Sequence, residues 1–302
     1  MTSPLVTPRF PIRNIVVPTD FSTASEAVLH VAAAWAAERR ATLHIVHFIP
    51  ALDYVLAIED YAATLEALTQ VGREGLARIA TDPALQGVPH RTYLEQMEVA
   101  DGLNALVASQ HGDLIMVASA GKHGVEKVLL GSCAEKIFRT ADCPVLLFGP
   151  RMRRPPAPGP LRNLVLAVDF GPATEAALAV ALGLARDAQA QLHLLHVQAP
   201  GLHTAQTPSP GSEWMAARLR ALVPAGETGW EPTVRVQHGT AAEVIAAVAR
   251  ELAADLVVLG VRRPPRVALY TGWATAYQVL GTAPCPVLTV REGRPRPDPP
   301  AA

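Results

Sequence analysis

The sequence predicts an α/β protein with two tandem domains, each a parallel sheet covered on both faces by helices. Three observations predict this fold class. Short apolar segments alternate with helical patterns along the chain. These segments are continuously apolar, as expected of strands buried on both faces. The whole pattern occurs again after a proline-rich segment, so the 302 residues fit two domains of ordinary size.

The first half supplies five strands and four helices. Apolar segments bounded by turn residues predict the strands at residues 13–20, 42–48, 91–97, 114–117 and 144–148. Helical spacing predicts the helices at residues 27–39, about 60–79, 103–110 and from Cys133 onward. Two capping boxes, Thr23 with Glu26 and Ser132 with Glu135, predict where the first and last of these helices begin.

The second half repeats the first. Residues 162–170 echo residues 13–21, and His196 follows His47 by 149 positions in a similar strand. Such self-similarity predicts a tandem duplication. We therefore expect a first domain at residues 1–149, a stiff proline-rich linker at 150–160, a second domain at 161–291 and a disordered tail at 292–302.

Composition argues against several classes of protein. No uninterrupted apolar segment is long enough for a membrane span, and residues 1–11 lack the basic and apolar regions of a signal peptide. The net charge of −1 argues against a general nucleic-acid surface. Three cysteines without C-x-x-C spacing fit a reducing compartment. We expect a cytoplasmic protein without a membrane or nucleic-acid partner.

A strand, a glycine-containing loop and a helix N-terminus follow one another after residue 113. Gly121 and Gly131 lie in the loop, and Ser132 precedes the helical pattern. Backbone N–H groups in such a segment can hold a phosphate. The alternative is that the glycines only turn the chain and the serine only caps the helix.

All the lysines of the chain lie in this same segment: Lys122, Lys127 and Lys136. A compact ammonium group suits phosphate. The alternative, which applies above all to Lys136, is a solvated loop and helix face.

The second copy provides an internal comparison. Arg263 replaces the first glycine of the loop, while Trp273 and Ala274 replace the second glycine and the serine. An indole prevents a close approach of backbone to phosphate, and alanine has no hydroxyl group to donate. A capping box remains at Thr275 and Gln278, so the helix can still begin. We therefore expect a phosphate site in the first copy alone. The alternative is that side chains of the second copy bind another anion, namely those of Arg262, Arg263 and Arg266.

Both halves resemble the universal stress protein family, over nearly the whole chain except linker and tails. The family's nucleotide-binding motif is G-x2-G-x9-G-[ST]. The first half matches it at Gly121, Gly131 and Ser132 and departs from it at Ala118. The resemblance implies doubly wound sheets of five parallel strands in the order 3-2-1-4-5. It also implies ATP across the carboxyl ends of strands one and four, with an accompanying Mg²⁺ left open.

The resemblance also implies which residues form the site. Asp20 would accept from adenine or ribose. The alternative is a helix-entry residue, because Asp169 persists in the second copy. Lys122 and His123 are candidates for additional charge near the phosphates. The implied nucleotide-binding residues are Pro18, Thr19, Asp20, Phe48, Val117, Ala118, Ala120, Gly121, Gly131, Ser132 and Cys133.

Other chemistry is less well supported. His44 and His47 point to opposite faces of a strand, and His193 and His196 repeat this pattern, so packing explains these residues better than a metal site. No Walker A, H-E-x-x-H or G-x-S-x-G sequence is present. Cys133 at a helix N-terminus could have a lowered pKa, although a small buried residue is the commoner role.

Three functions fit these observations. The first is a non-enzymatic ATP-binding stress protein with a regulatory role. The second is a slow ATPase, for which His123 is the candidate to orient water. The third is a scaffold that has lost nucleotide binding. For assembly, the resemblance implies pairing of fifth strands. Residues 145–148 and 287–290 could pair within one chain, with homodimer formation left open.

Overall fold

The structure is a computed structural model, and it describes residues 10–49, 61–119, 131–152, 159–199, 211–224, 231–262 and 274–292. In the first half, strands and helices alternate along the chain. Its elements are β1(Asn14–Pro18), α1(Thr23–Arg39), β2(Thr42–Ile49), α2(Tyr61–Ala80), the 3₁₀ turn η1(Pro83–Leu85), β3(His90–Gln96), α3(Val99–Ser109), β4(Leu114–Ala118), α4(Ser132–Thr140) and β5(Val145–Phe148).

The second half repeats this order without the 3₁₀ turn. Its elements are β6(Asn163–Ala167), α5(Thr174–Asp187), β7(Gln191–Gln198), α6(Ser212–Arg220), β8(Thr233–His238), α7(Ala241–Glu251), β9(Leu256–Val261), α8(Ala274–Thr282) and β10(Val287–Arg291). Among the described residues, no helix has the length and apolar character needed to cross a membrane.

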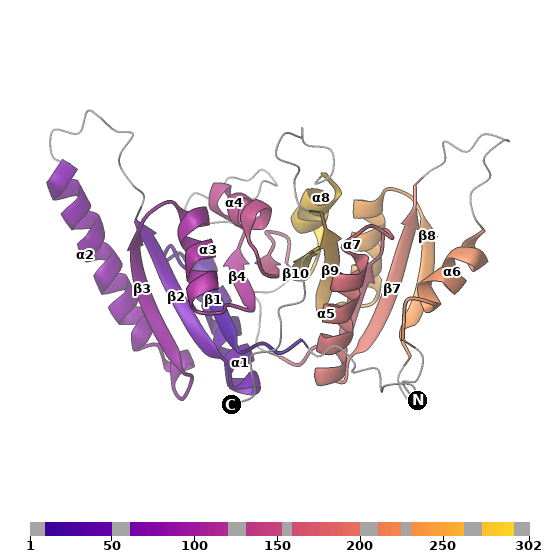
Figure 1. The fold of residues 1–302 in the computed structure, drawn as a ribbon, viewed down its shortest axis with the longest axis horizontal. Helices are drawn as coiled ribbons and strands as arrows, with labels where there is room; N and C mark the ends of the chain where they lie inside the picture. The colour runs from indigo at the N-terminus through magenta and orange to yellow at the C-terminus, as the bar shows by residue number, and fades with distance from the viewer. Residues whose placement is uncertain are drawn as a thin grey trace.

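The ten strands form one sheet in the order β3-β2-β1-β4-β5-β10-β9-β6-β7-β8 (Figure 1). Within each half every strand pair is parallel, which confirms the predicted α/β fold and the order 3-2-1-4-5. The halves meet where β5 runs antiparallel to β10, with Leu146 opposite Leu288. In the first half, the strand order reverses direction between β1 and β4.

Helices cover both faces of the sheet, and the continuously apolar strands contribute to two cores. In β5, Leu146 and Phe148 belong to one core, whereas Val145 and Leu147 belong to the other. The first core also contains residues of α1, α2, α5 and α6, and the second contains residues of α3, α4, α7 and α8. Each core includes residues of both halves, so the two domains are joined by packing as well as by the β5–β10 pair.

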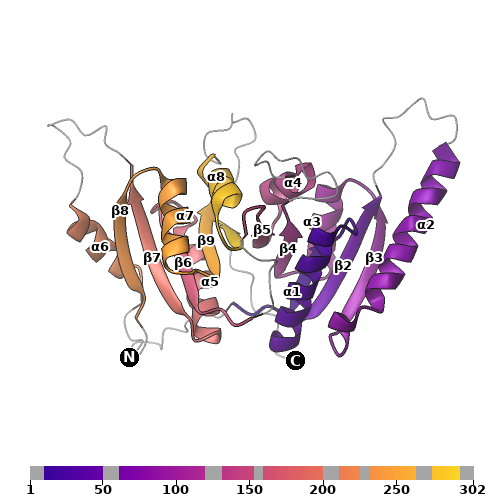
Figure 2. The ribbon, with the colours of Figure 1, turned by 180° about the vertical axis from the view of Figure 1, so that it is seen from behind.

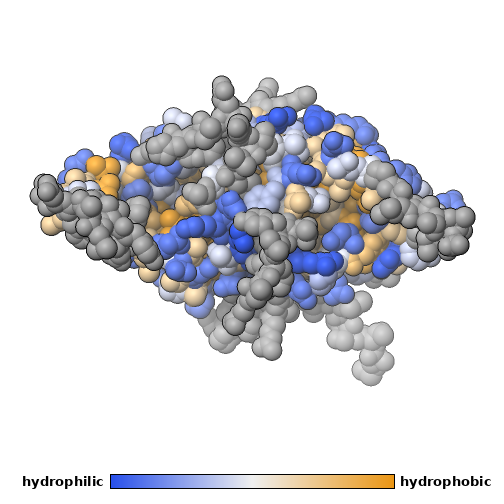
Figure 3. Space-filling view, turned by 90° about the horizontal axis from the view of Figure 1, so that it is seen from above, coloured by the Kyte–Doolittle hydropathy of each residue, from blue (hydrophilic) through white to orange (hydrophobic). Residues whose placement is uncertain are grey.

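The two halves form a broad V, with α2 and α6 at its outer ends (Figures 1 and 2). Seen from above, hydrophilic and hydrophobic residues are interspersed over the surface (Figure 3). This view looks onto the side where α4 and α8 lie near the centre of the molecule.

The helix starts differ from the predicted capping boxes. Helix α1 is capped by Ser22, whose hydroxyl accepts from the backbone N–H of Ser25 at 3.2 Å, so Thr23 is the first helical residue. Helix α4 has Gly131 at its N-cap, so the prediction that Ser132 occupies this position is wrong. Helix α8 contains Thr275 in its first turn, which excludes that residue as the cap. In all three helices the predicted cap residue already belongs to the helix, so the helix begins earlier in the chain than the capping box predicts.

Candidate functional site

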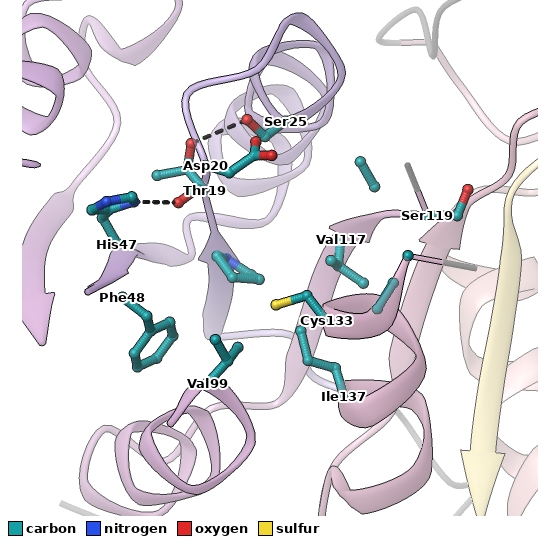
Figure 4. Close-up of a pocket in the computed structure, with 14 residues that line it drawn as sticks. Thr19, Asp20, Ser25, His47, Phe48, Val99, Val117, Ser119, Cys133 and Ile137 are labelled. Atoms are coloured by element: carbon teal, nitrogen blue, oxygen red, sulfur yellow. Dashed lines mark hydrogen bonds between the residues drawn. The ribbon is translucent and has the colours of Figure 1, made fainter. Parts of the chain in front are cut away.

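A pocket of about 130 Å³ lies at the carboxyl ends of β1, β2 and β4 (Figure 4). Open α/β sheets bind ligands at such a position, where the strand order reverses. Helices α1, α3 and α4 complete the walls. The residues that line the pocket are Pro18, Thr19, Asp20, Ser25, His47, Phe48, Val99, Val117, Ala118, Ser119, Gly131, Cys133, Ala134 and Ile137.

The pocket brings together eight of the eleven residues that the sequence implied: Pro18, Thr19, Asp20, Phe48, Val117, Ala118, Gly131 and Cys133. Ala120, Gly121, Lys122 and His123 lie outside the described residues, and for Ser132 the structure describes the backbone alone. Six lining residues were not predicted: Ser25, His47, Val99, Ser119, Ala134 and Ile137. Of these six residues, only His47 stands out in the sequence, because His196 repeats it in the second half. That repetition favours a packing role and does not by itself indicate a pocket residue.

One side of the pocket is polar, because β1 ends there and α1 begins. The hydroxyl groups of Thr19 and Ser25 are hydrogen-bonded at 3.2 Å. The Asp20 carboxylate accepts from the backbone N–H of Ser22 at 3.0 Å, so Asp20 shapes the turn into α1. His47 Nδ1 lies 2.8 Å from the carbonyl oxygen of Thr19, which fixes Nδ1 as the protonated nitrogen.

The other side of the pocket is apolar. Phe48 from β2, Val99 from α3 and Ile137 from α4 approach it from three elements (Figure 4). Val117 of β4 lies beside them and is buried, as are Phe48 and Ile137. Pockets with one apolar wall and a few polar groups are typical of sites for small organic ligands.

The N-terminus of α4 opens onto the pocket through Gly131 and Cys133. The backbone N–H of Gly131 donates to the carbonyl oxygen of Ser119 at 2.7 Å, which fixes the helix start against the end of β4. No side chain caps this helix. Its first-turn N–H groups lack partners within the helix and favour an anion. A Cβ atom at Gly131 would lie 3.2 Å from the Ser119 oxygen, so glycine permits this close approach.

Ala118, where the chain departs from the motif, is accommodated without backbone strain. It is the last residue of β4 and pairs with Phe148 in β5. Its φ angle is not positive, since the described non-glycine residues with positive φ are elsewhere. Alanine therefore fits the backbone at this position of the motif.

Cys133 does not have the lowered pKa that its helix-terminal position suggested. Desolvation, followed by the carboxylates of Glu98 and Asp20, raises the pKa of the Cys133 thiol to about 11. The thiol points into the pocket (Figure 4), where these effects outweigh the helix dipole. At neutral pH the pocket therefore presents a neutral thiol.

Lys136 forms an ion pair at the surface. Its ammonium group lies 2.5 Å from the Glu98 carboxylate, and both side chains are about half exposed. Glu98 is the N-cap of α3, where it accepts from the backbone N–H of Ala100 at 2.7 Å. The ion pair therefore links α3 to α4 at the surface, as the solvated-face interpretation expects.

The corresponding region of the second domain is organised differently. Asp169 accepts from the backbone N–H of Gly171 at 2.8 Å and from the Thr174 hydroxyl at 3.3 Å, so it is used in the entry to α5. Gly260, which corresponds to Ala118, lies so close to α5 that an added Cβ would be 3.1 Å from the Ala173 oxygen. Arg263, Arg266 and Trp273 lie outside the described residues. The ends of β9 and α5 therefore approach each other closely.

The fold and the pocket define a tandem doubly wound α/β protein with a ligand pocket at a point where strand order reverses. The model of the universal stress protein family matches residues 11–149 and 160–291. These matches cover most of the chain, and the chain belongs to the universal stress protein family.

Known relatives support this assignment. Universal stress protein MJ0531 of Methanocaldococcus jannaschii is 32% identical over 138 residues, which are 45% of this chain and 81% of that protein. Universal stress protein A homolog 1 of Coxiella burnetii is 31% identical over 146 residues, covering 44% of this chain and 94% of that protein. Each match therefore spans about one of the two domains.

A solved structure shares the tandem fold. A universal stress protein from Archaeoglobus fulgidus has a TM-score of 0.71 and is 21% identical, covering 95% of this chain and 98% of that one. At this identity the similarity establishes the fold alone.

Proposed function

We propose that this chain is an ATP-binding universal stress protein that binds the nucleotide in its first domain. Its role would be regulatory and would depend on the bound nucleotide. One observation carries the proposal. Residues from β1, β2, β4 and α4 that the family resemblance implies line one pocket, although they are far apart in the sequence. The pocket lies at the position where doubly wound folds bind nucleotides.

The chemistry of the walls suits the parts of ATP. The apolar side suits the adenine ring, and the Asp20 carboxylate can accept from a ribose hydroxyl or the adenine amino group. The α4 N-terminus suits a phosphate. At about 130 Å³ the pocket is smaller than a complete site for a drug-sized ligand, so the phosphates would extend past its mouth beside Gly131. Mg²⁺, if it accompanies ATP, would be held largely by the phosphates.

The second domain is proposed not to bind ATP. Its Gly260 packs closely against Ala173 at the start of α5. Ala274 offers no hydroxyl at the position of Ser132. We therefore expect one ATP per chain.

Retained nucleotide is the first test. The purified chain is denatured and the released small molecules are separated by chromatography; adenine nucleotide at close to one per chain supports binding. A scaffold that has lost binding would release none and would also fail to bind added ATP at millimolar concentration.

Turnover separates a binding protein from a slow ATPase. ATP hydrolysis is measured for the natural chain and for His123→Ala. Binding without turnover supports the regulatory role. Turnover that His123→Ala abolishes, with ATP affinity unchanged, would make the protein an ATPase instead.

We also propose that the β5–β10 pair holds the two domains together in the cytoplasm. Besides the backbone ladder, the Thr289 hydroxyl donates to the carbonyl oxygen of Val145 at 3.2 Å, and Arg291 donates to the carbonyl oxygen of Phe138. The rings of Phe138 and Tyr277 pack edge to face at 5.1 Å between α4 and α8. Solution scattering should match one compact V-shaped particle, and two separated domains would contradict the proposal. An increase in the particle mass measured by scattering as the protein concentration rises would reveal a homodimer.

A further inference from the structure

Three metal-ligating side chains meet outside the pocket, where α1 packs against η1. Glu26 and His30 stand four residues apart and so share one face of α1. Asp82 is the N-cap of η1. One ligand atom from each of the three residues lies within 4.8 Å of the other two.

We propose that Glu26, His30 and Asp82 form a binding site for a divalent transition-metal ion of the Zn²⁺ type, with water completing its coordination. Imidazole nitrogen and carboxylate oxygen are ligands that Zn²⁺ accepts, and three protein ligands with an open position are a known arrangement. Two carboxylates and a neutral imidazole also balance the charge of a divalent cation.

The separations are close to those of a coordination shell. His30 Nε2 lies 3.0 Å from Asp82 Oδ2. Two ligands that each lie about 2.1 Å from a tetrahedrally coordinated ion are separated by about 3.4 Å. The cluster therefore needs adjustments of up to about 1.5 Å, which the exposed and flexible Glu26 side chain can provide.

Asp82 and His30 contact each other, and the fold leaves ligand atoms of the cluster available. Asp82 Oδ1 accepts from the backbone N–H of Ala84 at 2.8 Å, so the carboxylate is fixed while Oδ2 faces His30. The Glu26 carboxylate has no ion-pair or hydrogen-bond partner in the part of the chain that the structure describes. The His30 side chain is 41% exposed, so an ion can reach the cluster from solvent.

The duplicated domain shows that the fold does not require His30. Glu175 occupies the position of Glu26, but Ala179 occupies that of His30. Helix α5 nevertheless forms over Thr174–Asp187. The histidine thus distinguishes the first domain from the second, and His30→Ala introduces a residue that the same fold already accepts.

Calorimetric titration of the full chain with ZnCl₂ in a buffer that does not bind metal tests the proposal. We expect one ion per chain with a dissociation constant on the order of micromolar, about −8 kcal/mol. His30→Ala should weaken binding at least tenfold. Asp82→Asn should do the same, because the amide keeps the Oδ1 acceptor for Ala84 and loses the second carboxylate oxygen.

His238→Ala is the matched control, because that residue is an exposed histidine of the second domain, and it should leave binding unchanged. Circular dichroism and the thermal midpoint confirm that each variant is folded. Zn²⁺ should raise the midpoint of the natural chain and not that of His30→Ala. Absent binding, or binding that survives both His30→Ala and Asp82→Asn, would overturn the proposal, and either result is independent of ATP.

Discussion

His47 donates a hydrogen bond from Nδ1 to the carbonyl oxygen of Thr19 at 2.8 Å and thereby joins the ends of β1 and β2. The second domain contains the same relationship, since His196 Nδ1 lies 2.8 Å from the carbonyl oxygen of Val168. In each domain the histidine ring also packs against a phenylalanine that lies just after the end of the first strand. These residues are Phe21 for His47 and Phe170 for His196. The bond therefore belongs to the fold, but in the first domain it also shapes the wall of the pocket.

This pair of histidines gives a matched experiment. His47→Ala and His196→Ala should each lower the free energy of unfolding by about 1–3 kcal/mol, because a buried carbonyl group loses its donor. Only His47→Ala should also weaken ATP binding, by about tenfold or about 1.4 kcal/mol. Urea unfolding and ATP titration measure the two effects. Equal effects of both variants on ATP binding would contradict a site confined to the first domain.

The Cys133 thiol should react slowly with alkylating reagents at physiological pH. Its raised pKa of about 11 leaves little thiolate below that pH. At pH 8, alkylation by iodoacetamide should be about a hundredfold slower than for a thiol with the ordinary value of 9.0. The rate should rise as pH increases toward 11. Peptide mass spectrometry across a pH series measures it, and rapid alkylation at pH 7 would show a lowered pKa instead.

The Lys136–Glu98 ion pair should contribute little to the stability of the fold or to ATP binding. Because the pair is solvent-exposed, Lys136→Ala should cost less than about 1 kcal/mol of unfolding free energy. ATP affinity should stay within about twofold of the natural chain. Glu98→Gln, which retains an oxygen acceptor for the Ala100 N–H, is the companion variant. A loss of ATP binding in Lys136→Ala alone would place this ammonium group on the phosphates.

Gly260 should be intolerant of a side chain. Gly260→Ala should lower the free energy of unfolding by about 1–3 kcal/mol, because the new Cβ would lie 3.1 Å from the Ala173 oxygen. The reciprocal change, Ala118→Gly, should alter stability by no more than about 1 kcal/mol. Denaturant unfolding compares them. An unchanged stability for Gly260→Ala would mean that α5 can move away from β9.

The sequence was sufficient to predict the sheet and most of the pocket. Continuous apolar segments such as 114–117 marked buried parallel strands, and residues at strand ends fell together because parallel strands end at one edge. The duplication then distinguished the two domains at Trp273 and Ala274. These features follow from local composition and from the comparison of the two halves.

Other features depended on contacts that local patterns do not contain. The partner of Lys136 is Glu98, which lies 38 positions earlier in the chain. The repetition of His47 by His196 favours a packing role, although His47 also lines the pocket of the first domain. The effect of Asp20 and Glu98 on the Cys133 pKa likewise required the folded arrangement.

We propose above all that the pocket of the first domain is the ATP site of the chain. Equilibrium titration with ATP tests it most directly, using the natural chain, Cys133→Phe and Thr275→Phe. Cys133 and Thr275 occupy corresponding positions of α4 and α8, but only Cys133 lines the pocket of the first domain. We predict one ATP per chain for the natural protein and Thr275→Phe, and at least a tenfold loss for Cys133→Phe. Unchanged ATP binding in Cys133→Phe, or no binding by the natural chain at millimolar ATP, would contradict the claim.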